Sequence, residues 1–166
     1  SYEEHLSVYD GLSTTVKLNK LSKDKGLPAD KHQQVWADKQ KATFEIFREL
    51  QPDEDLIDYF QELRDAGFQI AVASNSIRNT VKIILLGLGL LEYVDYYVSN
   101  EDVKRSKPFP EMYWQCMIAC NALPKDTVII EDSHIGRQAA MDSGALLVTV
   151  ENRKDFGHGH IIQIMN

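Results

Sequence analysis

The 166-residue sequence lacks the features that would direct it to a membrane or to nucleic acid. No apolar run approaches the roughly 20 residues that a bilayer-spanning helix needs. The net charge is −7, so no basic excess is present to neutralise a nucleic-acid backbone, and nonspecific nucleic-acid binding is disfavoured. The polar, acidic start, Ser1-Tyr2-Glu3-Glu4-His5, does not resemble a secretory signal peptide, and we expect a cytoplasmic protein.

Cysteine is also scarce, with Cys116 and Cys120 as the two examples in the sequence. They lie four residues apart in a helical pattern, which is poor geometry for a disulfide, and they lack the partners of a metal site. We interpret them as two small half-buried thiols in a reducing compartment. Internal repeats and low-complexity segments are absent as well.

What the sequence does contain is an ordinary globular composition, with 43% hydrophobic and 26% charged residues. A chain of this length is typical of one domain and can bury roughly 70% of its unfolded surface. Residues 1–50 are polar and helical in pattern, with one helix opening near Leu12, for which Ser13 is the predicted N-cap, and a second after a loop at 23–30. From residue 51 onward the pattern changes, and helices alternate with short apolar strands.

This second part predicts an α/β fold. Strands are expected at 68–73, 96–99, 127–130 and 145–150, and helices at 55–66, 79–88, 111–122 and 135–143. Apolar strands that alternate with helices predict a parallel sheet flanked by helices on both faces. Ligands of such sheets bind at the carboxyl ends of the strands.

Polar clusters follow three of the predicted strands. Ser74-Asn75 comes first; a hydroxyl followed by free backbone N–H groups can hold phosphate oxygens, although a helix cap is the simpler explanation for this pair alone. Lys107 stands second, in Ser106-Lys107-Pro108-Phe109-Pro110, where proline restrains the backbone and an ammonium can meet a phosphate. An exposed surface lysine is the alternative.

Glu131 and Asp132 form the third cluster, at the end of the apolar run Val128-Ile129-Ile130. Two carboxylates at the end of a buried strand are costly unless a cation sits beside them. Mg²⁺ is such a cation, because it takes oxygen ligands and keeps waters that a phosphate can replace. An acidic loop that caps the next helix is the alternative. The joint occurrence of a hydroxyl, a restrained lysine and two acids is more specific than any one of them.

In these three motifs the sequence resembles the haloacid dehalogenase superfamily, and within it the branch of β-phosphoglucomutases and small-molecule phosphatases with a helical cap. The matching stretches are 70–76, then 106–110 with Tyr113, and 128–133 with Gly136, Ala139, Ala140 and Gly144-Ala145. The resemblance covers about residues 53–152 and, more weakly, the first third. It implies a Mg²⁺-dependent phosphoryl transfer from a small phosphorylated metabolite, with hydrolysis ranked above sugar phosphomutase activity. In that family Ser74 and Lys107 correspond to phosphate-binding catalytic residues, and Glu131 and Asp132 to the metal acids.

The same resemblance exposes a missing part. The family's first motif, Asp-x-Asp-Gly-Thr, supplies the aspartate nucleophile and the general acid/base, and the sequence does not contain it. Val8-Tyr9-Asp10-Gly11-Leu12 has Val8 at the nucleophile position, and Asp53-Glu54-Asp55 opens a helix whose dipole explains its acids. We expect that a preceding segment carries this motif. Residues 1–50 would then be a partial cap, and residues 51–166 a core without its first strand.

That expectation has consequences for the chain alone. We expect it to be inactive, to bind Mg²⁺ weakly, and to be marginally stable or to self-associate through an exposed sheet edge. The alternative is a catalytically inactive binding or regulatory module on the same scaffold. A two-component receiver domain fits less well, because its acid pair should come early, and Gly87-Leu88-Gly89-Leu90 is not a dinucleotide-binding fingerprint.

Three further features remain open. Lys39 and Lys41, on the second helix of the first third, are candidates for contact with a distal phosphate, although an exposed helix face explains them equally well. His134 follows the acid pair and receives no role. The tail Gly157-His158-Gly159-His160 has the residues of a metal clamp, but we interpret it as a surface loop.

Overall fold

The computed structural model describes residues 8, 9 and 11–151. Its elements are α2 (Thr14–Lys25), the 3₁₀ helix η2 (Ala29–Lys31) and α3 (His32–Phe47), followed by α4 (Glu54–Asp65), β1 (Ala71–Ala73), α5 (Arg78–Gly87), the 3₁₀ helix η3 (Leu91–Tyr93), β2 (Tyr96–Val98), α6 (Glu111–Ala119), the 3₁₀ helix η4 (Pro124–Asp126), β3 (Val128–Glu131), α7 (His134–Ser143) and β4 (Leu146–Thr149). The order confirms the predicted change from helices alone to alternating strands and helices. None of the described helices is long and apolar enough to cross a bilayer.

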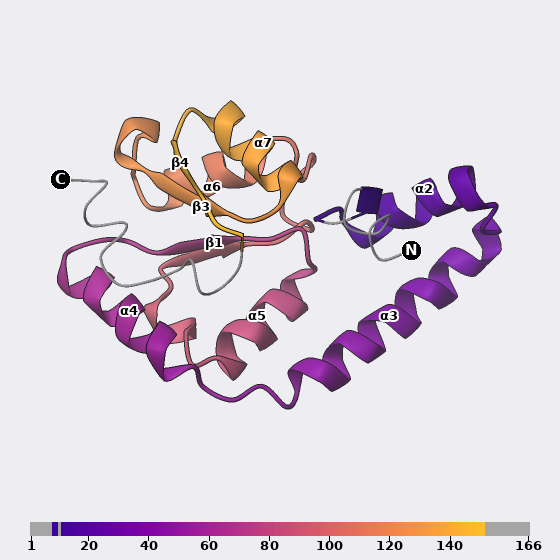
Figure 1. The fold of residues 1–166 in the computed structure, drawn as a ribbon, viewed down its shortest axis with the longest axis horizontal. Helices are drawn as coiled ribbons and strands as arrows, with labels where there is room; N and C mark the ends of the chain where they lie inside the picture. The colour runs from indigo at the N-terminus through magenta and orange to yellow at the C-terminus, as the bar shows by residue number, and fades with distance from the viewer. Residues whose placement is uncertain (1–7, 10, 152–166) are drawn as a thin grey trace.

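α2 and α3 form a helical arm that projects from the α/β body, and α3 runs back to the body beside α5 (Figure 1). Ser13 caps α2 as predicted, since its hydroxyl accepts a hydrogen bond from the Val16 N–H at 3.5 Å. Gly26 ends the helix in the left-handed conformation, at φ 73°, which glycine adopts without steric cost. No residue of α3 is buried, and its apolar residues Trp36 and Phe44 are exposed.

The described strands form two parallel pairs instead of the single sheet that we expected. β1 pairs with β2, in the register Val72 to Tyr97, and β3 pairs with β4, in the register Ile130 to Val148. No ladder joins β1 to β3 within the described residues. The prediction of an α/β fold with parallel strands is confirmed, and the sheet is divided in the middle.

Helices cover both faces of the strands (Figure 1). On one face Ile129 packs against Tyr113 and Met117 of α6 and against Ala139 and Ala140 of α7. On the other face the neighbouring residues of β3, Val128 and Ile130, pack against the cluster of Tyr59 and Leu63 of α4. Successive side chains of a strand point to opposite faces, so these contacts show that both faces of β3 are covered by helices. This is the environment of a central strand.

A cavity of about 940 Å³ runs between the two strand pairs, lined by residues 67–76 on one side and 126–133 on the other. Both sets include strand residues, so the cavity follows the facing edges of β1 and β3 over their length. Ala71, in β1, is exposed, whereas a residue of an interior strand would be buried. Within the described residues, the division of the sheet therefore leaves a slot between β1 and β3 that is lined by both strands.

Some predicted boundaries shift for local reasons. The strand expected at 68–73 is reduced to β1, because the Ile70 N–H donates to the Asp95 carboxylate at 2.8 Å and not to a strand carbonyl. The helix expected to reach residue 122 ends at Ala119, and Asn121 turns into the left-handed region at φ 50°. Cys116 is buried, Cys120 is half-buried, and both are free thiols, as predicted.

Candidate active site

Polar groups from two loops and from the end of a strand meet at one end of the cavity. Ser74 and Asn75 directly follow β1, Lys107 lies in the loop after β2, and Glu131 is the last residue of β3. These residues and Asp132 all line the same cavity. Parallel strands share the direction of their carboxyl ends, so the convergence follows from the topology. The structure brings together all the residues that the three motifs placed at strand ends.

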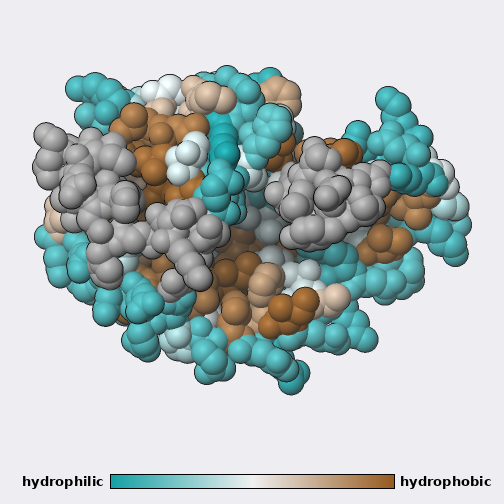
Figure 2. All heavy atoms as spheres, viewed as in Figure 1, coloured by the Kyte–Doolittle hydropathy of each residue, from teal (hydrophilic) through white to brown (hydrophobic). Residues whose placement is uncertain are grey.

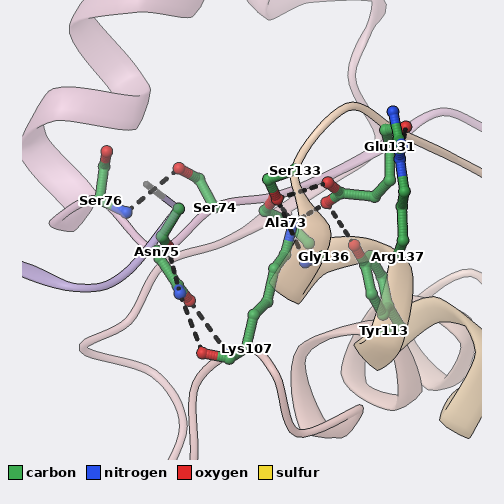
Figure 3. Close-up of polar contacts among 11 residues, drawn as sticks. Ala73, Ser74, Asn75, Ser76, Lys107, Tyr113, Glu131, Ser133, Gly136 and Arg137 are labelled. Atoms are coloured by element: carbon green, nitrogen blue, oxygen red, sulfur yellow. Dashed lines mark hydrogen bonds and ion pairs between the residues drawn. The ribbon is translucent and has the colours of Figure 1, made fainter. Parts of the chain in front are cut away.

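Lys107 is a buried lysine, with a side chain only 8% exposed. Its ammonium forms an ion pair with Glu131 and donates to the Ala73 carbonyl at 3.0 Å. It also lies 4.9 Å from the centre of the Tyr113 ring, within the range of a cation–π contact. The peptide bond between Lys107 and Pro108 is cis. Figure 3 shows the lysine side chain extending from its loop toward Ala73 and the carboxylate.

Glu131 is equally buried, at 7% exposure, and its carboxylate accepts hydrogen bonds from three side chains. Lys107 and the Tyr113 hydroxyl both donate to Oε1, and the Ser133 hydroxyl donates to Oε2 at 3.1 Å. Burial acts to raise the pKa of Glu131, but the Lys107 charge and these hydrogen bonds outweigh it, so the pKa lies below its ordinary value. The carboxylate is therefore ionised and held in one orientation at neutral pH.

Two of these partners were missed by the sequence reasoning. The hydroxyl of Tyr113 stands 18 residues from Glu131 in the chain, and burial and the Glu131 charge both raise its own pKa, so it remains a donor. Ser133, the N-cap of α7, accepts from the Gly136 N–H at 3.1 Å and also donates to Glu131. The sequence shows a tyrosine, Tyr113, one helical turn after Pro108-Phe109-Pro110. It does not show that the hydroxyl of this tyrosine bonds to Glu131.

Gly136 sits directly against Glu131. A Cβ atom built on this glycine would overlap the Glu131 carboxyl group, so any side chain here would displace the acid. Arg137, the next residue, donates to the Val150 carbonyl at 2.8 Å and braces the ends of β3 and β4. The start of α7 is therefore fitted to the position of the carboxylate.

Asn75 connects three segments through one side chain (Figure 3). Its amide nitrogen donates to the Gly11 carbonyl at 2.8 Å and to the Lys107 carbonyl at 3.1 Å, and its amide oxygen accepts from the Lys107 N–H at 3.1 Å. We predicted a direct ligand contact for Asn75. Its amide is committed to these backbone groups, so a contribution to ligand binding would come from its main chain.

Ser74 differs from Asn75 in that its hydroxyl stays available as a donor. The Ser74 N–H donates to the Val98 carbonyl at 3.0 Å, which extends the pairing of β1 with β2. Its oxygen accepts from the Ser76 N–H at 3.1 Å, and a hydroxyl that accepts can still donate. The hydroxyl proton can therefore point into the cavity.

The acid pair divides into one engaged and one open carboxylate. Glu131 is buried against Lys107, whereas Asp132 is exposed and lines the cavity. Across residues 8, 9 and 11–151, no group of three His, Cys, Asp or Glu side chains is arranged to hold a metal ion. Mg²⁺ is commonly bound by one or two carboxylates together with waters and substrate phosphates, so these two acids fit part of such a site.

The helical arm contributes the opposite wall of the cavity. Gly11, Thr14, Lys17 and Lys39 line it. Gly11 rests on the start of α7, since a Cβ atom there would lie 2.8 Å from Ile135 and 3.2 Å from Ser133. Figure 2 shows the surface hollowed between the arm and the α/β body. Lys41 faces elsewhere, in a groove of about 260 Å³ between α3 and α5, and His134 is exposed at the start of α7.

The rejected acid clusters also have clear positions. Asp53 caps α4, with its carboxylate accepting from the Leu56 N–H at 3.2 Å, and Glu54 and Asp55 lie in the first turn, as expected from the helix dipole. Asp10 and the tail 157–160 lie outside the described residues. The cluster Asp53-Glu54-Asp55 therefore does not replace a catalytic aspartate at the strand ends.

Comparison with known proteins gives consistent matches. The family of haloacid dehalogenase-like hydrolases matches residues 2–150. Pyrophosphatase PpaX from Anoxybacillus flavithermus is 26% identical over 105 residues, which cover 61% of this chain and 49% of that protein. The chain thus spans about half the length of this curated relative.

Solved structures show the same architecture. β-Phosphoglucomutase from Clostridium difficile has a TM-score of 0.78 at 18% identity, with 94% of this chain and 72% of that chain covered. A hydrolase of the same family from Deinococcus radiodurans, solved with bound phosphate and sodium, has a TM-score of 0.62 at 26% identity, covering 85% of this chain and 62% of that chain.

Proposed function

Because the chain belongs to the family of haloacid dehalogenase-like hydrolases, we propose that the end of its cavity formed by Ser74, Lys107, Glu131 and Asp132, called the rim below, binds a phosphoryl group. The bound group would belong to a small phosphorylated metabolite, and the rim would support its hydrolysis. The observation that carries the proposal is the convergence of Ser74, Lys107 and Asp132 on one cavity. Phosphatase activity ranks above phosphomutase activity, since PpaX is a phosphohydrolase by name.

Each rim residue has a role that its contacts allow. Among the described residues, Lys107 uses two of its three ammonium donors for Ala73 and Glu131, which leaves the third for a phosphate oxygen. The Ser74 hydroxyl donates to a second oxygen. Fixed donors aimed at the charge of a transferring phosphoryl group lower the barrier, because they need no reorganisation during the reaction.

Asp132 and Glu131 would hold Mg²⁺ in this proposal. The ion would neutralise phosphate charge when bound. The chain's own part is to keep Glu131 ionised and fixed by Lys107, Tyr113 and Ser133, and to hold Asp132 exposed at the cavity. The engagement of Glu131 with Lys107 leaves the pair incomplete as a strong metal site, so we keep the expectation of weak binding by this chain.

The phosphoryl-accepting aspartate would come from a segment other than residues 8–151. The slot between β1 and β3 supports this part of the proposal, because no ladder joins the two strands within the described residues and Lys107 and Ser74 line the same cavity. A strand placed there would join the two half-sheets and bring its last residue to the rim. The helical arm would act as the cap that excludes water and selects the substrate.

The decisive experiment compares two proteins. One is the 166-residue chain, and the other is the same chain extended by the sequence encoded immediately upstream. Both are assayed with p-nitrophenyl phosphate and a panel of sugar phosphates, with and without Mg²⁺. We expect turnover from the extended protein with Mg²⁺ and none from the chain alone. Turnover by the chain alone would show that the nucleophile lies within it.

The second candidate is an inactive binding module, which the missing Asp-x-Asp-Gly-Thr motif favours. It predicts that the extended protein binds phosphorylated metabolites without turning them over. Replacing Ser74 by Ala, which keeps the buried Lys107–Glu131 pair, distinguishes both candidates from a site unrelated to phosphate, because both use the Ser74 hydroxyl for binding.

A further inference from the structure

Asn100, in the loop after β2, holds the main chain of the loop that carries Ser74. Its side-chain amide nitrogen donates to the Asn75 carbonyl at 2.7 Å, and its own N–H donates to the Ser76 carbonyl at 3.1 Å. The two residues that follow Ser74 are therefore each fixed by a hydrogen bond from Asn100. Asn100 is not among the described residues that line the cavity, so it acts on the loop from behind.

The peptide unit between Asn75 and Ser76 is bonded on both of its sides. Its carbonyl oxygen accepts from the Asn100 amide, and its N–H donates to the Ser74 Oγ at 3.1 Å (Figure 3). A trans peptide is planar, with its C=O and N–H in opposite directions, so a bond that fixes the carbonyl also fixes the direction of the N–H. The Asn100 amide thus determines the side from which the Ser74 oxygen receives its hydrogen bond.

This bond restricts the Ser74 hydroxyl before any ligand arrives. With one lone pair of the oxygen occupied by the Ser76 N–H, the hydroxyl proton is directed elsewhere, and Ser74 lines the cavity. Without the bond from Asn100, the peptide unit could rotate, and the N–H would no longer hold the oxygen. The hydroxyl would then have to be ordered during binding, which costs affinity for a phosphate oxygen.

Asn100 is held in place by its neighbours in the loop. Ser99 is fully buried, and its N–H and hydroxyl donate to the Asp102 carboxylate at 2.8 and 2.6 Å. Asp102 also forms an ion pair with Arg78 at the start of α5. Residues 99–102 therefore have a fixed shape, and they tie the loop after β2 to the loop after β1.

From these contacts we infer that Asn100 is a positioning residue for phosphate binding, which acts through the Asn75–Ser76 peptide unit on the Ser74 hydroxyl. The inference rests on the proposed function, in which that hydroxyl donates to a phosphate oxygen. A purely structural role would affect phosphate binding whether or not Ser74 carries its hydroxyl. A positioning role requires that the loss of Asn100 costs no further affinity once the hydroxyl is gone.

Binding calorimetry with inorganic phosphate on the 166-residue chain tests this in a double-mutant cycle. Asn100→Ala removes the side-chain donor and keeps the main-chain bond to Ser76. We expect Ser74→Ala and Asn100→Ala each to weaken phosphate binding about tenfold, which corresponds to about 1.4 kcal/mol. The double variant should bind no more weakly than Ser74→Ala alone. Asn79→Ala, at an exposed residue of α5, is the matched control and should bind phosphate as the parent does.

Circular dichroism and urea unfolding verify that each variant is folded. Asn100→Ser, whose side chain is one bond too short for the Asn75 carbonyl but suits a turn, replaces Asn100→Ala in the cycle if the alanine variant does not fold. The positioning role is overturned, while the proposed function stands, if phosphate binding needs the Ser74 hydroxyl but loss of Asn100 leaves it unchanged. It is also overturned if loss of Asn100 weakens binding by the same factor with and without that hydroxyl. If the parent does not bind phosphate, or Ser74→Ala binds it equally well, both proposals are contradicted.

Discussion

The ammonium of Lys107 and the carboxylate of Glu131 form a buried ion pair that joins the loop after β2 to the end of β3. Lys107 follows the pair β1–β2 and Glu131 belongs to the pair β3–β4. The ion pair therefore crosses the slot at the end where the strands have their carboxyl termini. Because both charges are removed from water, each is stabilised chiefly by the other and by the hydrogen bonds around them.

Loss of one partner should therefore destabilise the fold strongly. Lys107→Met leaves Glu131 buried without its counter-charge, and we expect a loss of about 3–5 kcal/mol in the free energy of unfolding, measured in urea at neutral pH. Lys125→Met is the control, because Lys125 is exposed and lies 3.9 Å from an exposed Asp126. Its effect should stay within about 0.5 kcal/mol. Equal effects of the two substitutions would contradict the buried pair.

The hydroxyl of Tyr113 should account for part of this stability. Tyr113→Phe keeps the ring beside Lys107 but removes the donor to Glu131 Oε1. A hydrogen bond to a charged group contributes about 1.5–3 kcal/mol, so a loss in this range is expected in the same urea measurement. Tyr97→Phe, at a half-buried tyrosine of β2, should change stability much less. A Tyr113→Phe protein as stable as the parent would rule out the bond.

Gly136→Ala offers a test by sign. In an ordinary helix interior, alanine stabilises by about 1 kcal/mol relative to glycine. Here the new methyl group would overlap the Glu131 carboxyl group, and we expect a destabilisation of about 1–3 kcal/mol. In a Glu131→Ala background the space is free, so the same substitution should become neutral or stabilising. A stabilising effect in both backgrounds would show that the contact is not tight.

The carboxylate of Asp95 bonds to Arg64 of α4 and to the Ile70 N–H just before β1, and we expect this link to be sensitive to acid. Burial acts to raise its pKa, but the hydrogen bond from Arg64, the Ile70 N–H and the Arg64 charge lower it below the ordinary value of 3.8. A lowered pKa in the folded state stabilises the fold above the unfolded pKa, and this contribution is lost as the pH falls through the folded value. The parent should thus exceed Asp95→Asn in stability at pH 7. The gap should close progressively below about pH 4. A gap that persists at low pH would contradict the linkage.

Among the described residues, no strand pairs with the facing edges of β1 and β3. This predicts concentration-dependent self-association of the 166-residue chain, measurable by sedimentation velocity. Ala71→Lys places a charge on the exposed residue of β1 that lines the slot and should reduce the association. Leu86→Lys adds the same charge on α5, where Leu86 is 54% exposed, and should not. A monomer at every concentration would contradict an accessible edge.

Much of the fold was readable from local signals. Ser13 and Asp53 were recognisable as helix caps or first-turn acids, and strand–helix alternation was sufficient to predict parallel strands. The convergence of Ser74, Lys107 and Glu131 was also predictable, because parallel strands deliver their carboxyl ends to one edge. These features depend on short spacing or on topology, and both are visible in a sequence.

Other features depend on distances between residues remote in the chain. The bonds from Lys107 and Tyr113 to Glu131, and the bond from Ile70 to Asp95 that shortens β1, span 18 to 25 residues and have no local pattern. The choice between Lys39 and Lys41 depends on which side of α3 faces the body. Residues two positions apart on a helix point roughly 200° away from each other, so one of them had to turn from the cavity.

The side chain of Asn75 makes two kinds of contact, one to the helical arm and one to the loop of Lys107. One bond from its amide nitrogen reaches the arm at Gly11, and the remaining bonds secure the backbone of Lys107. Swinging the arm outward would break the first and spare the others. A small molecule could then enter or leave the cavity while Lys107 stays aligned with Glu131. Opening of the arm would therefore not require the Lys107–Glu131 ion pair to form again.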